Sequence, residues 1–194
     1  MRRLATVFAV VMALFGCSEA PRFTSTDITG AEFGREFSAP FTDHTGQPRR
    51  LADFKGKVVM IFFGYTQCPD VCPTTLTGMA QAMKLLGGDA ARVQVLFVTL
   101  DPERDTQQLL AAYVPQFNPS FIGLTANPAT TAATALEFKV LYQKQPGSTP
   151  TTYTLDHSAN SYIYDPQGRL RLYVKHGEAP ANIAADVKLL LAGK

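Results

Sequence analysis

The stretch VVMIFFGYTQCPDVCP, residues 58–73, decides the fold. It opens with an apolar, mostly β-favouring run that ends at Gly64, which is typical of a central strand buried on both faces. Two cysteines and two prolines follow, and apolar residues then recur at helical spacing over residues 76–86 before a glycine pair. The sequence therefore predicts a buried strand, a turn and a helix that begins near Cys72.

The segments around this stretch predict a single α/β domain. Residues 37–51 favour a β-hairpin with its turn at 42–46, and residues 145–152 favour a loop. Asp105 and Gln108 are spaced as a capping box at the start of a helix. We expect further strands at 93–100, 121–124, 161–164 and 170–174, and further helices at 105–113, 128–138 and 180–191. This order predicts a thioredoxin-like fold, with a central mixed sheet flanked by helices and an added N-terminal β-hairpin.

Composition excludes several other classes of protein. The chain has 194 residues, 46% of them hydrophobic and 18% charged, which is typical of one globular domain and not of collagen, a coiled coil or a disordered chain. Its formal net charge of +2 is small and scattered. A nucleic-acid partner is therefore not expected, because such a partner requires a concentrated basic surface.

The N-terminus has the pattern of a bacterial export signal. Arg2 and Arg3 precede an almost wholly apolar run over residues 4–15, which is shorter than the roughly 20 residues of a membrane-spanning helix. Residues 14–17 (LFGC) look like a lipobox, in which a small residue precedes the cysteine that is lipidated. Cys17 is thus the predicted lipidation site, and an ordinary secretory leader is the alternative.

Three parts of the chain follow from this interpretation. We predict a signal peptide over residues 1–16, a lipidated cysteine and flexible tether over residues 17–36, and the thioredoxin-like domain over residues 37–194. The domain would then lie in the bacterial periplasm, anchored by lipid to a membrane, most simply the inner one. Lipidation would leave Cys68 and Cys72 as the cysteines of the folded part.

Cys68 and Cys72 are four residues apart where the predicted strand gives way to the predicted helix. Cα atoms at this helical spacing lie about 6 Å apart, within reach of a disulfide, so the pair can be a redox-active dithiol or disulfide. The helix N-terminus favours the thiolate form of a nearby cysteine. A structural disulfide, a reactive pair and a metal site all remain open at this point.

A metal site needs a third ligand, and His157 is the best of the three histidines. It lies in a polar stretch just before the strand at 161–164, which this topology brings back beside the start of the first helix. Two thiolates and one imidazole suit Cu(I), and with an added oxygen ligand they also suit Cu(II). His44 and His176 are expected to be solvent-exposed, with His176 as the reserve ligand.

Three ordered motifs resemble those of the Sco/SenC family of copper chaperones. They are FGYTQCPDVCP at 63–73, DPERDT at 101–106 and DHS at 156–158, and the resemblance extends over residues 35–191. It implies a thioredoxin-like fold and a membrane anchor. The lipobox stands where family members usually have a transmembrane helix, so the chain departs from the family pattern only in the mode of anchoring.

The resemblance also implies a cofactor and a partner. Family members bind copper through the two cysteines of a CxxxC motif and a distant histidine, which correspond here to Cys68, Cys72 and His157. They serve the maturation of the binuclear copper site of cytochrome c oxidase subunit II, by delivering copper, by reducing that subunit's cysteines, or by both. A copper donor and a thiol reductant would be further partners, and a similar exported copper protein could replace the subunit.

Two hypotheses of other classes compete with the copper-binding assembly factor. One is a membrane-tethered periplasmic thiol-disulfide oxidoreductase, which the CxxxC spacing and the lack of proline over residues 156–164 disfavour. The other is a thiol peroxidase in which Cys68 is oxidised to a sulfenic acid.

Several neighbouring residues have both a structural and a functional interpretation. Met79 and Met83 lie on an apolar helix face and are expected in the core. For Asp70, Asp101 and Tyr65, a role at the site and a role in turns or packing both remain open.

Overall fold

The computed structural model describes residues 22–147 and 152–194. The predicted signal peptide over residues 1–16 and the predicted lipidation site Cys17 lie outside these residues. Both stay predictions.

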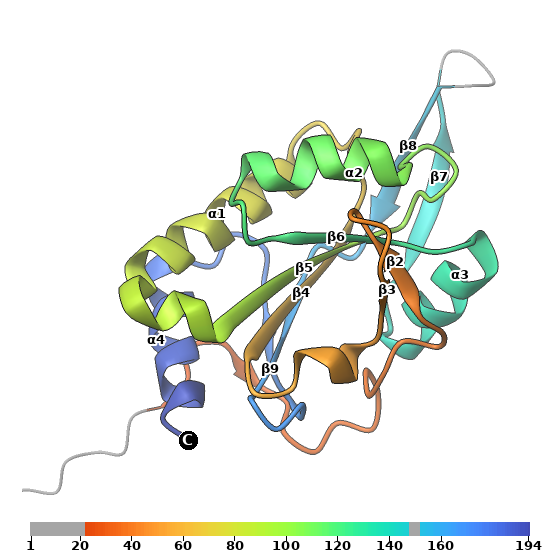
Figure 1. Cartoon of the computed structure of the whole chain (residues 1–194). Coiled ribbons are helices and arrows are strands. Elements are labelled where there is room, and N and C mark those ends of the chain that lie inside the picture. The colour runs from red at the N-terminus through yellow and green to blue at the C-terminus, as the bar shows by residue number, and fades with distance from the viewer. Residues whose placement is uncertain (1–21, 148–151) are drawn as a thin grey trace, which may run out of the picture.

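An eight-stranded mixed sheet forms the centre of the domain, in the order β1-β10-β9-β4-β5-β6-β2-β3. β4, β5 and β6 are parallel, and the remaining neighbours are antiparallel (Figure 1). The strands are β1 (Thr26–Asp27), β2 (Phe41–Asp43), β3 (Pro48–Arg49), β4 (Val58–Gly64), β5 (Val93–Thr99), β6 (Ile122–Thr125), β9 (Ser161–Tyr164) and β10 (Leu170–Val174). β2 and β3 are the predicted N-terminal hairpin, and β2 adds it to the sheet by pairing with β6.

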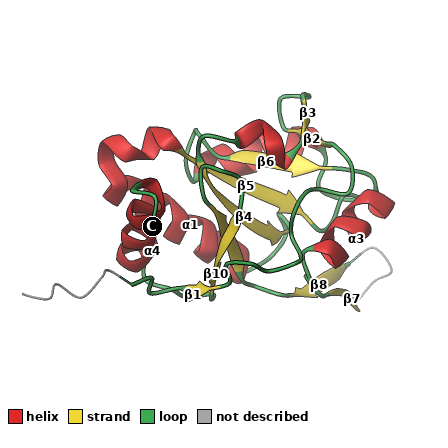
Figure 2. Ribbon diagram, turned by 90° about the horizontal axis from the view of Figure 1, so that it is seen from below, coloured by secondary structure: helices red, strands yellow, loops and turns green. Residues whose placement is uncertain are grey.

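Helices cover both faces of this sheet. α1 and α4 lie side by side at one face, and α3 lies at the opposite side in both ribbon views (Figures 1 and 2). The helices are α1 (Val71–Leu86), α2 (Gln107–Tyr113), α3 (Pro128–Glu137) and α4 (Pro180–Leu191), with short 3-10 turns η1 (Leu51–Phe54), η2 (Gly87–Arg92) and η3 (Val114–Gln116). The predicted central mixed sheet flanked by helices is confirmed.

β4 has no polar residue because it runs through the core of the domain. Every residue of β4 and β5 is buried, because helices or loops lie on both faces of these two strands. Phe62 and Phe63 point to opposite faces: the Phe62 ring lies 6.2 Å from the Phe97 ring of β5, and the Phe63 ring lies 5.0 Å from the Phe138 ring at the end of α3. The carboxyl end of β4 is therefore held firmly in the middle of the domain.

The tether predicted over residues 17–36 is wrong for its described part. β1 pairs with β10 at the edge of the sheet, and the backbone N–H groups of Thr24 and Ser25 each donate a 2.8 Å hydrogen bond to the carboxylate of Asp186 in α4. The Glu36 carboxylate also accepts a hydrogen bond from Leu51 N–H. The side chains of Asp186 and Glu36 thus hold the backbone of a segment whose low aliphatic content had suggested a flexible tether.

Two local predictions also need correction. Residues 145 and 146 of the predicted loop at 145–152 belong to β7 (Tyr142–Pro146), which pairs with β8 (Tyr153–His157) in a separate two-stranded sheet, and residues 148–151 between the two strands lie outside the described residues. Asp105 does not cap α2, because it lies in the core and Thr106 takes the cap position, accepting a hydrogen bond from Leu109 N–H.

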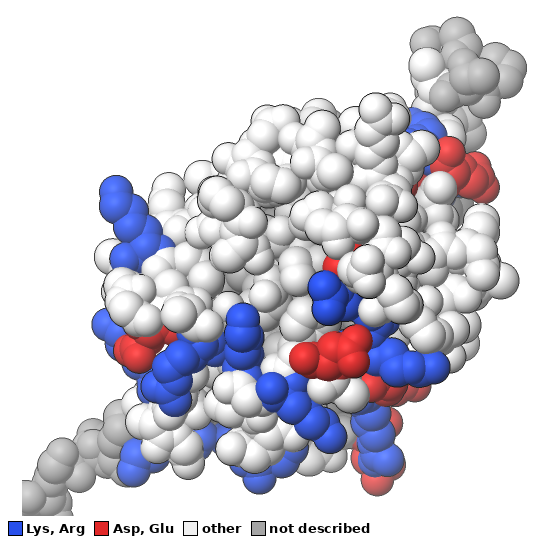
Figure 3. Space-filling model, in the orientation of Figure 1, with Lys and Arg blue, Asp and Glu red and all other residues white. Residues whose placement is uncertain are grey.

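Charged side chains are unevenly distributed over the surface. The sequence from 106 to 136, which contains α2, β6 and most of α3, includes no Asp, Glu, Lys or Arg. Figure 3 shows the same asymmetry: most charged residues lie in the lower half of the view, a few lie at its upper left and upper right, and the surface over α2 carries none. Among the residues that the structure describes, no helix combines the length and apolarity that a membrane crossing requires.

One buried carboxylate stabilises the turn of the added hairpin β2–β3. The side chain of Asp43, which is 1% exposed, accepts hydrogen bonds from Thr45 N–H, Thr45 Oγ1, Gln47 N–H and Arg49 Nε. Burial opposes ionisation of Asp43, but these donors outweigh it and lower its pKa to about 2 from 3.8. The ionised carboxylate is therefore the form that stabilises the turn.

This depressed pKa predicts acid sensitivity. Asp43 contributes stability that is present above pH 4 and is lost as the pH falls towards 2, so we expect Asp43→Asn to lower the free energy of unfolding by about 2 kcal/mol at pH 7 and by much less near pH 2. Urea denaturation at both pH values measures this. Asp89→Asn, at an exposed carboxylate in a 3.6 Å ion pair with Arg92, is the control. Parallel pH profiles for wild type and Asp43→Asn would contradict the assignment.

Candidate metal centre

The two cysteines lie at the junction of β4 and α1. Asp70 is the residue before α1, so Cys72 is in the first helical turn while Cys68 is in the preceding loop. Cys68 is partly buried, Cys72 is 0% exposed, and both are free thiols. The backbone N–H of Cys72 points at Cys68 Sγ, 3.4 Å away. An N–H of the first helical turn, which has no partner within the helix, is therefore satisfied by the Cys68 sulfur.

His157 completes a three-residue group. It is the last residue of β8, and its Nε2 lies 3.5 Å from Cys72 Sγ. Its Nδ1 lies 3.0 Å from the carbonyl oxygen of Ser158, which can only accept, so Nδ1 carries the proton and Nε2 keeps its lone pair. The ligand atoms of Cys68, Cys72 and His157 all lie within 4.8 Å of one another. The structure thus brings together the three predicted ligands.

Burial favours the neutral forms of Cys72 and His157 when no metal is bound. Removal from water raises the pKa of the Cys72 thiol well above its ordinary value, and nearby Cys68 and Asp105 add to the effect. Burial also lowers the pKa of His157. A neutral imidazole is the form that binds a metal, whereas Cys72 must lose its proton on binding.

Aromatic rings hold His157 from two sides. The Phe62 ring lies 6.1 Å from the imidazole, and the Tyr65 ring lies 5.9 Å from it in an edge-on arrangement. Tyr65 is 2% exposed, and burial raises its pKa, so its hydroxyl stays protonated. Tyr65 therefore has a place in the core and also forms part of the wall of the site.

Gly64 is required by the close approach of the first helical turn. A Cβ atom at this position would lie 2.8 Å from Cys72 Sγ and 3.0 Å from ring carbons of Phe62 and Phe97. No side-chain carbon fits at that distance. The glycine that marks the strand end in the sequence is thus also what lets the thiol pack against the strand.

Asp105 is a supporting residue whose role the sequence reasoning missed. Its buried carboxylate accepts hydrogen bonds from Thr66 N–H, Thr66 Oγ1 and Thr99 Oγ1, and so ties the loop before Cys68 to the end of β5. Burial raises the pKa of Asp105. Its place in the loop after β5, a strand that ends beside the cysteine loop, was the available signal, but the capping-box spacing favoured another interpretation.

For the methionines and the two other histidines, the structure tests the predicted burial or exposure. Met79 and Met83 are 3% and 4% exposed, so their predicted place in the core is confirmed. His176 is exposed as predicted, and its Nδ1 lies 3.1 Å from Thr75 Oγ1. The prediction for His44 is wrong: it is partly buried, because its Nδ1 accepts a hydrogen bond from Gly123 N–H.

Asp70 and Asp101 differ in exposure and in their contacts. Asp70 is exposed, and its contacts are with Thr74 within the first turn of α1. Asp101 is 2% exposed, and its carboxylate binds Arg104 and Tyr153. Of these two acids, Asp101 is thus the one built into the structure around the site.

The sequence and its relatives agree with this geometry. Residues 25–192 match the family model described as SCO1/SenC. This chain belongs to the SCO1/SenC family. The mitochondrial SCO2 homolog of Mus musculus is 36% identical over 152 residues, which are 77% of this chain and 60% of that protein. This SCO1/SenC member therefore spans less than two thirds of the length of that relative.

Solved structures of SCO1/SenC proteins share the fold. ScoI of Bradyrhizobium japonicum, solved with copper bound, is 37% identical and matches with a TM-score of 0.73 over 78% of this chain and 96% of that one. A SCO1/SenC family lipoprotein from Bacillus anthracis is 25% identical, with a TM-score of 0.68 over 78% of this chain and 92% of that one. The predicted thioredoxin-like fold and family resemblance are confirmed.

The contact at Gly64 makes a prediction for this SCO1/SenC member. Gly64→Ala forces a methyl group against Cys72 Sγ, so we expect the free energy of unfolding to fall by about 1–3 kcal/mol. We also expect Cys72 to be alkylated faster, because its thiol is displaced from the core. Urea denaturation and mass-spectrometric alkylation kinetics measure the two effects.

Gly78→Ala is the matched control. Nothing lies within 4 Å of a Cβ at Gly78, which is inside α1, so alanine there should raise stability by up to about 1 kcal/mol and leave Cys72 alkylation unchanged. Equal effects of the two substitutions would rule out the steric explanation.

Proposed function

We propose that this protein binds one copper ion through Cys68, Cys72 and His157 and delivers it to an exported copper protein such as cytochrome c oxidase subunit II. The observation that carries the proposal is the convergence of three ligand atoms within 4.8 Å at the carboxyl end of β4. The copper bound to ScoI of Bradyrhizobium japonicum supports it.

The donor set fits copper better than it fits zinc. Two soft thiolates and one imidazole suit Cu(I), and Cu(II) can be held with an additional oxygen or water ligand. A structural zinc site usually has four protein ligands, whereas the metal-binding group found among the described residues offers three. Three ligands leave a coordination position at which an incoming ligand can attach.

Copper exchange is coupled to proton exchange at this site. Burial keeps Cys72 protonated in the metal-free protein, so binding of copper releases that proton, and departure of copper returns it. Cys68 is the more accessible thiol. A ligand from the acceptor therefore meets Cys68 before Cys72, and transfer proceeds by stepwise replacement of protein ligands.

A second candidate function is reduction of the acceptor's cysteines, which the pairing of an accessible and a buried thiol favours. The Cys68 thiolate attacks the acceptor disulfide, breaking its S–S bond and forming a mixed disulfide. The Cys72 thiol then gives its proton to the thiolate released from the acceptor and attacks the Cys68 sulfur, which breaks the mixed disulfide and releases the second acceptor sulfur, protonated from solvent. The acceptor gains two electrons and two protons, the protein is left with a Cys68–Cys72 disulfide, and a separate thiol reductant restores the dithiol.

We further propose export to the bacterial periplasm, where residues 1–16 are removed and Cys17 carries a lipid anchor in the membrane, most simply the inner one. The apolar run after Arg2 and Arg3 and the cysteine that follows it support this. The Bacillus anthracis relative named as a lipoprotein also supports it. A copper donor in the same compartment would load the site.

Copper titration tests the ligand set. In an anaerobic competition of reduced protein with a chromophoric Cu(I) chelator, we expect one copper per chain, no measurable binding by Cys72→Ser, and at least about a tenfold loss of affinity in His157→Ala, because even lost outer contacts of ligands cost that much. His176→Ala removes an exposed histidine and is the matched control. Full copper affinity in His157→Ala would remove His157 from the site.

The same variants separate the two candidate functions. Reduction of an oxidised copper domain of cytochrome c oxidase subunit II is followed by thiol labelling, and its metallation is followed by its absorption spectrum. We expect His157→Ala to lose metallation. Retention of rapid disulfide reduction by this variant without copper would make reductase activity the main function.

Anchoring is tested by cell fractionation. We expect the full chain to be recovered from membranes with a lipid mass on Cys17, and Cys17→Ser to lose that mass. Intact-protein mass spectrometry identifies the processed N-terminus. An unmodified Cys17 in membrane-bound protein would contradict the lipid anchor.

A further inference from the structure

The hairpin that carries His157 is not part of the main sheet. β7 and β8 pair only with each other, in a separate two-stranded sheet, whereas Cys68 and Cys72 follow directly from the central strand β4. His157 is the last residue of β8. Apart from the short connection to β9, the position of the third ligand relative to the cysteines therefore depends on contacts between this hairpin and the body of the domain.

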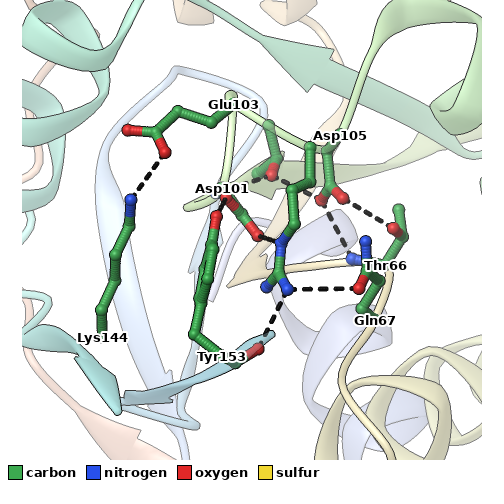
Figure 4. A network of polar contacts seen from close by, with 9 residues as sticks. Thr66, Gln67, Asp101, Glu103, Asp105, Lys144 and Tyr153 are labelled. Carbon is green, nitrogen blue, oxygen red and sulfur yellow. Dashed lines mark hydrogen bonds and ion pairs between the residues drawn. The ribbon is translucent and has the colours of Figure 1, made fainter. Parts of the chain in front are cut away.

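The side chain of Arg104 provides such a contact on two sides at once. Its Nη1 donates a 2.9 Å hydrogen bond to the carbonyl oxygen of Tyr153, in β8, and a 3.2 Å hydrogen bond to Oε1 of Gln67, the residue before Cys68 (Figure 4). The guanidinium carbon also lies 3.5 Å from the centre of the Tyr153 ring. One planar group thus touches both the strand that ends at His157 and the loop that contains Cys68.

Asp101 fixes this group to the main sheet. Its carboxylate, 1% exposed, pairs with Arg104 Nε and accepts a 2.6 Å hydrogen bond from the Tyr153 hydroxyl. Its backbone N–H donates to Thr99 Oγ1 at the end of β5. Asp101, Arg104 and Tyr153 therefore form a closed triangle, and Figure 4 shows the labelled partners around the guanidinium.

We propose that Arg104 is a positioning residue that sets the distance between His157 and the cysteine pair. It does not touch the ligand atoms, and it acts through Tyr153 on β8 and through Gln67 on the cysteine loop. A metal site needs its ligands within about 0.5 Å of the productive geometry, so a support common to both arms determines whether the imidazole reaches the metal. The proposal rests on the copper site proposed above.

Lysine cannot replace this arrangement. A lysine ammonium can pair with Asp101 but lacks the planar fork that bonds to two acceptors and stacks on a ring. Arg104→Lys therefore keeps the charge opposite a buried carboxylate, which protects the fold, and removes the contacts to Tyr153 and Gln67. It is the informative substitution.

The same hairpin supplies a matched control. Lys144 of β7 pairs with Glu103, next to Arg104 in the chain, at 2.6 Å, but both side chains are half exposed. Exposed pairs of this kind contribute little. Lys144→Met should therefore leave the copper site unchanged, although it also removes a bond between the hairpin and the loop after β5.

Copper affinity and a double-mutant cycle test the proposal. We expect Arg104→Lys to bind one Cu(I) with about 10- to 100-fold lower affinity, the range for lost outer contacts of metal ligands, and Lys144→Met to bind like wild type. Because Arg104 sets the distance between the imidazole and the cysteines, its effect on copper requires the imidazole, and adding Arg104→Lys to His157→Ala should cost no further affinity. Additive losses, or wild-type affinity in Arg104→Lys, would overturn the proposal.

A metal-free measurement separates this proposal from the copper function. The ring ¹⁵N signals of His157 in the reduced protein should move in Arg104→Lys and stay in Lys144→Met. If wild type bound no copper, the proposed function would fail, and unmoved His157 signals would then reject the positioning role independently. Should Arg104→Lys not fold, Tyr153→Phe removes only the hydroxyl bond to Asp101 and is judged by the same signals.

Discussion

The packing of Cys72 Sγ against the backbone of Gly64 is the constraint on which the rest of the site depends. This thiol is at once a core side chain, 0% exposed, and one of the three converging ligand atoms. A Cβ on Gly64 would lie 2.8 Å from the sulfur, so the first turn of α1 is pressed directly onto the end of β4. Because β4 is buried along its whole length, the position of the sulfur is fixed by the centre of the domain.

Burial then decides the charge state of the site. A buried thiolate or imidazolium without a partner would cost free energy, and burial accordingly favours the neutral thiol of Cys72 and the neutral ring of His157. The metal-free centre is stable without a compensating ion. Entry of a cation replaces a proton instead of adding an unpaired charge, which makes loading reversible.

The elements that carry the fold were predictable because their signals are local. The apolar run of β4, the glycines after it and after α1, and the helical spacing of the cysteines all depend on a few adjacent residues. The histidine ligand could be found because few histidines compete and one lies where the topology returns to the cysteines. Local pattern and the family resemblance were therefore sufficient for the centre of the domain.

The parts that were not predicted depend on contacts between distant residues. Thr24 and Ser25 are ordered by Asp186, far along the chain, and nothing in their own sequence indicates this. β7 and β8 consist mostly of polar, exposed residues, so their sequences lack the apolar alternation that indicates a strand and resemble that of a loop. Asp105 has the spacing of a capping box, but its carboxylate is buried and bonded to Thr66, far from it in the chain, and these contacts outweigh the local preference.

Cys72 and His157 are attached to different parts of the domain, and this difference affects how copper could leave. Cys72 cannot move without disturbing the core, whereas His157 lies on a hairpin outside the main sheet, joined to the domain by the short connection to β9, by side-chain contacts and by ring packing. In stepwise ligand exchange, the bond that breaks first is the one whose protein atom withdraws at least cost. The imidazole and the accessible Cys68 meet this condition, and Cys72 does not. In the proposed transfer, copper therefore stays bound to the buried thiolate of Cys72 until the acceptor has supplied the other ligands.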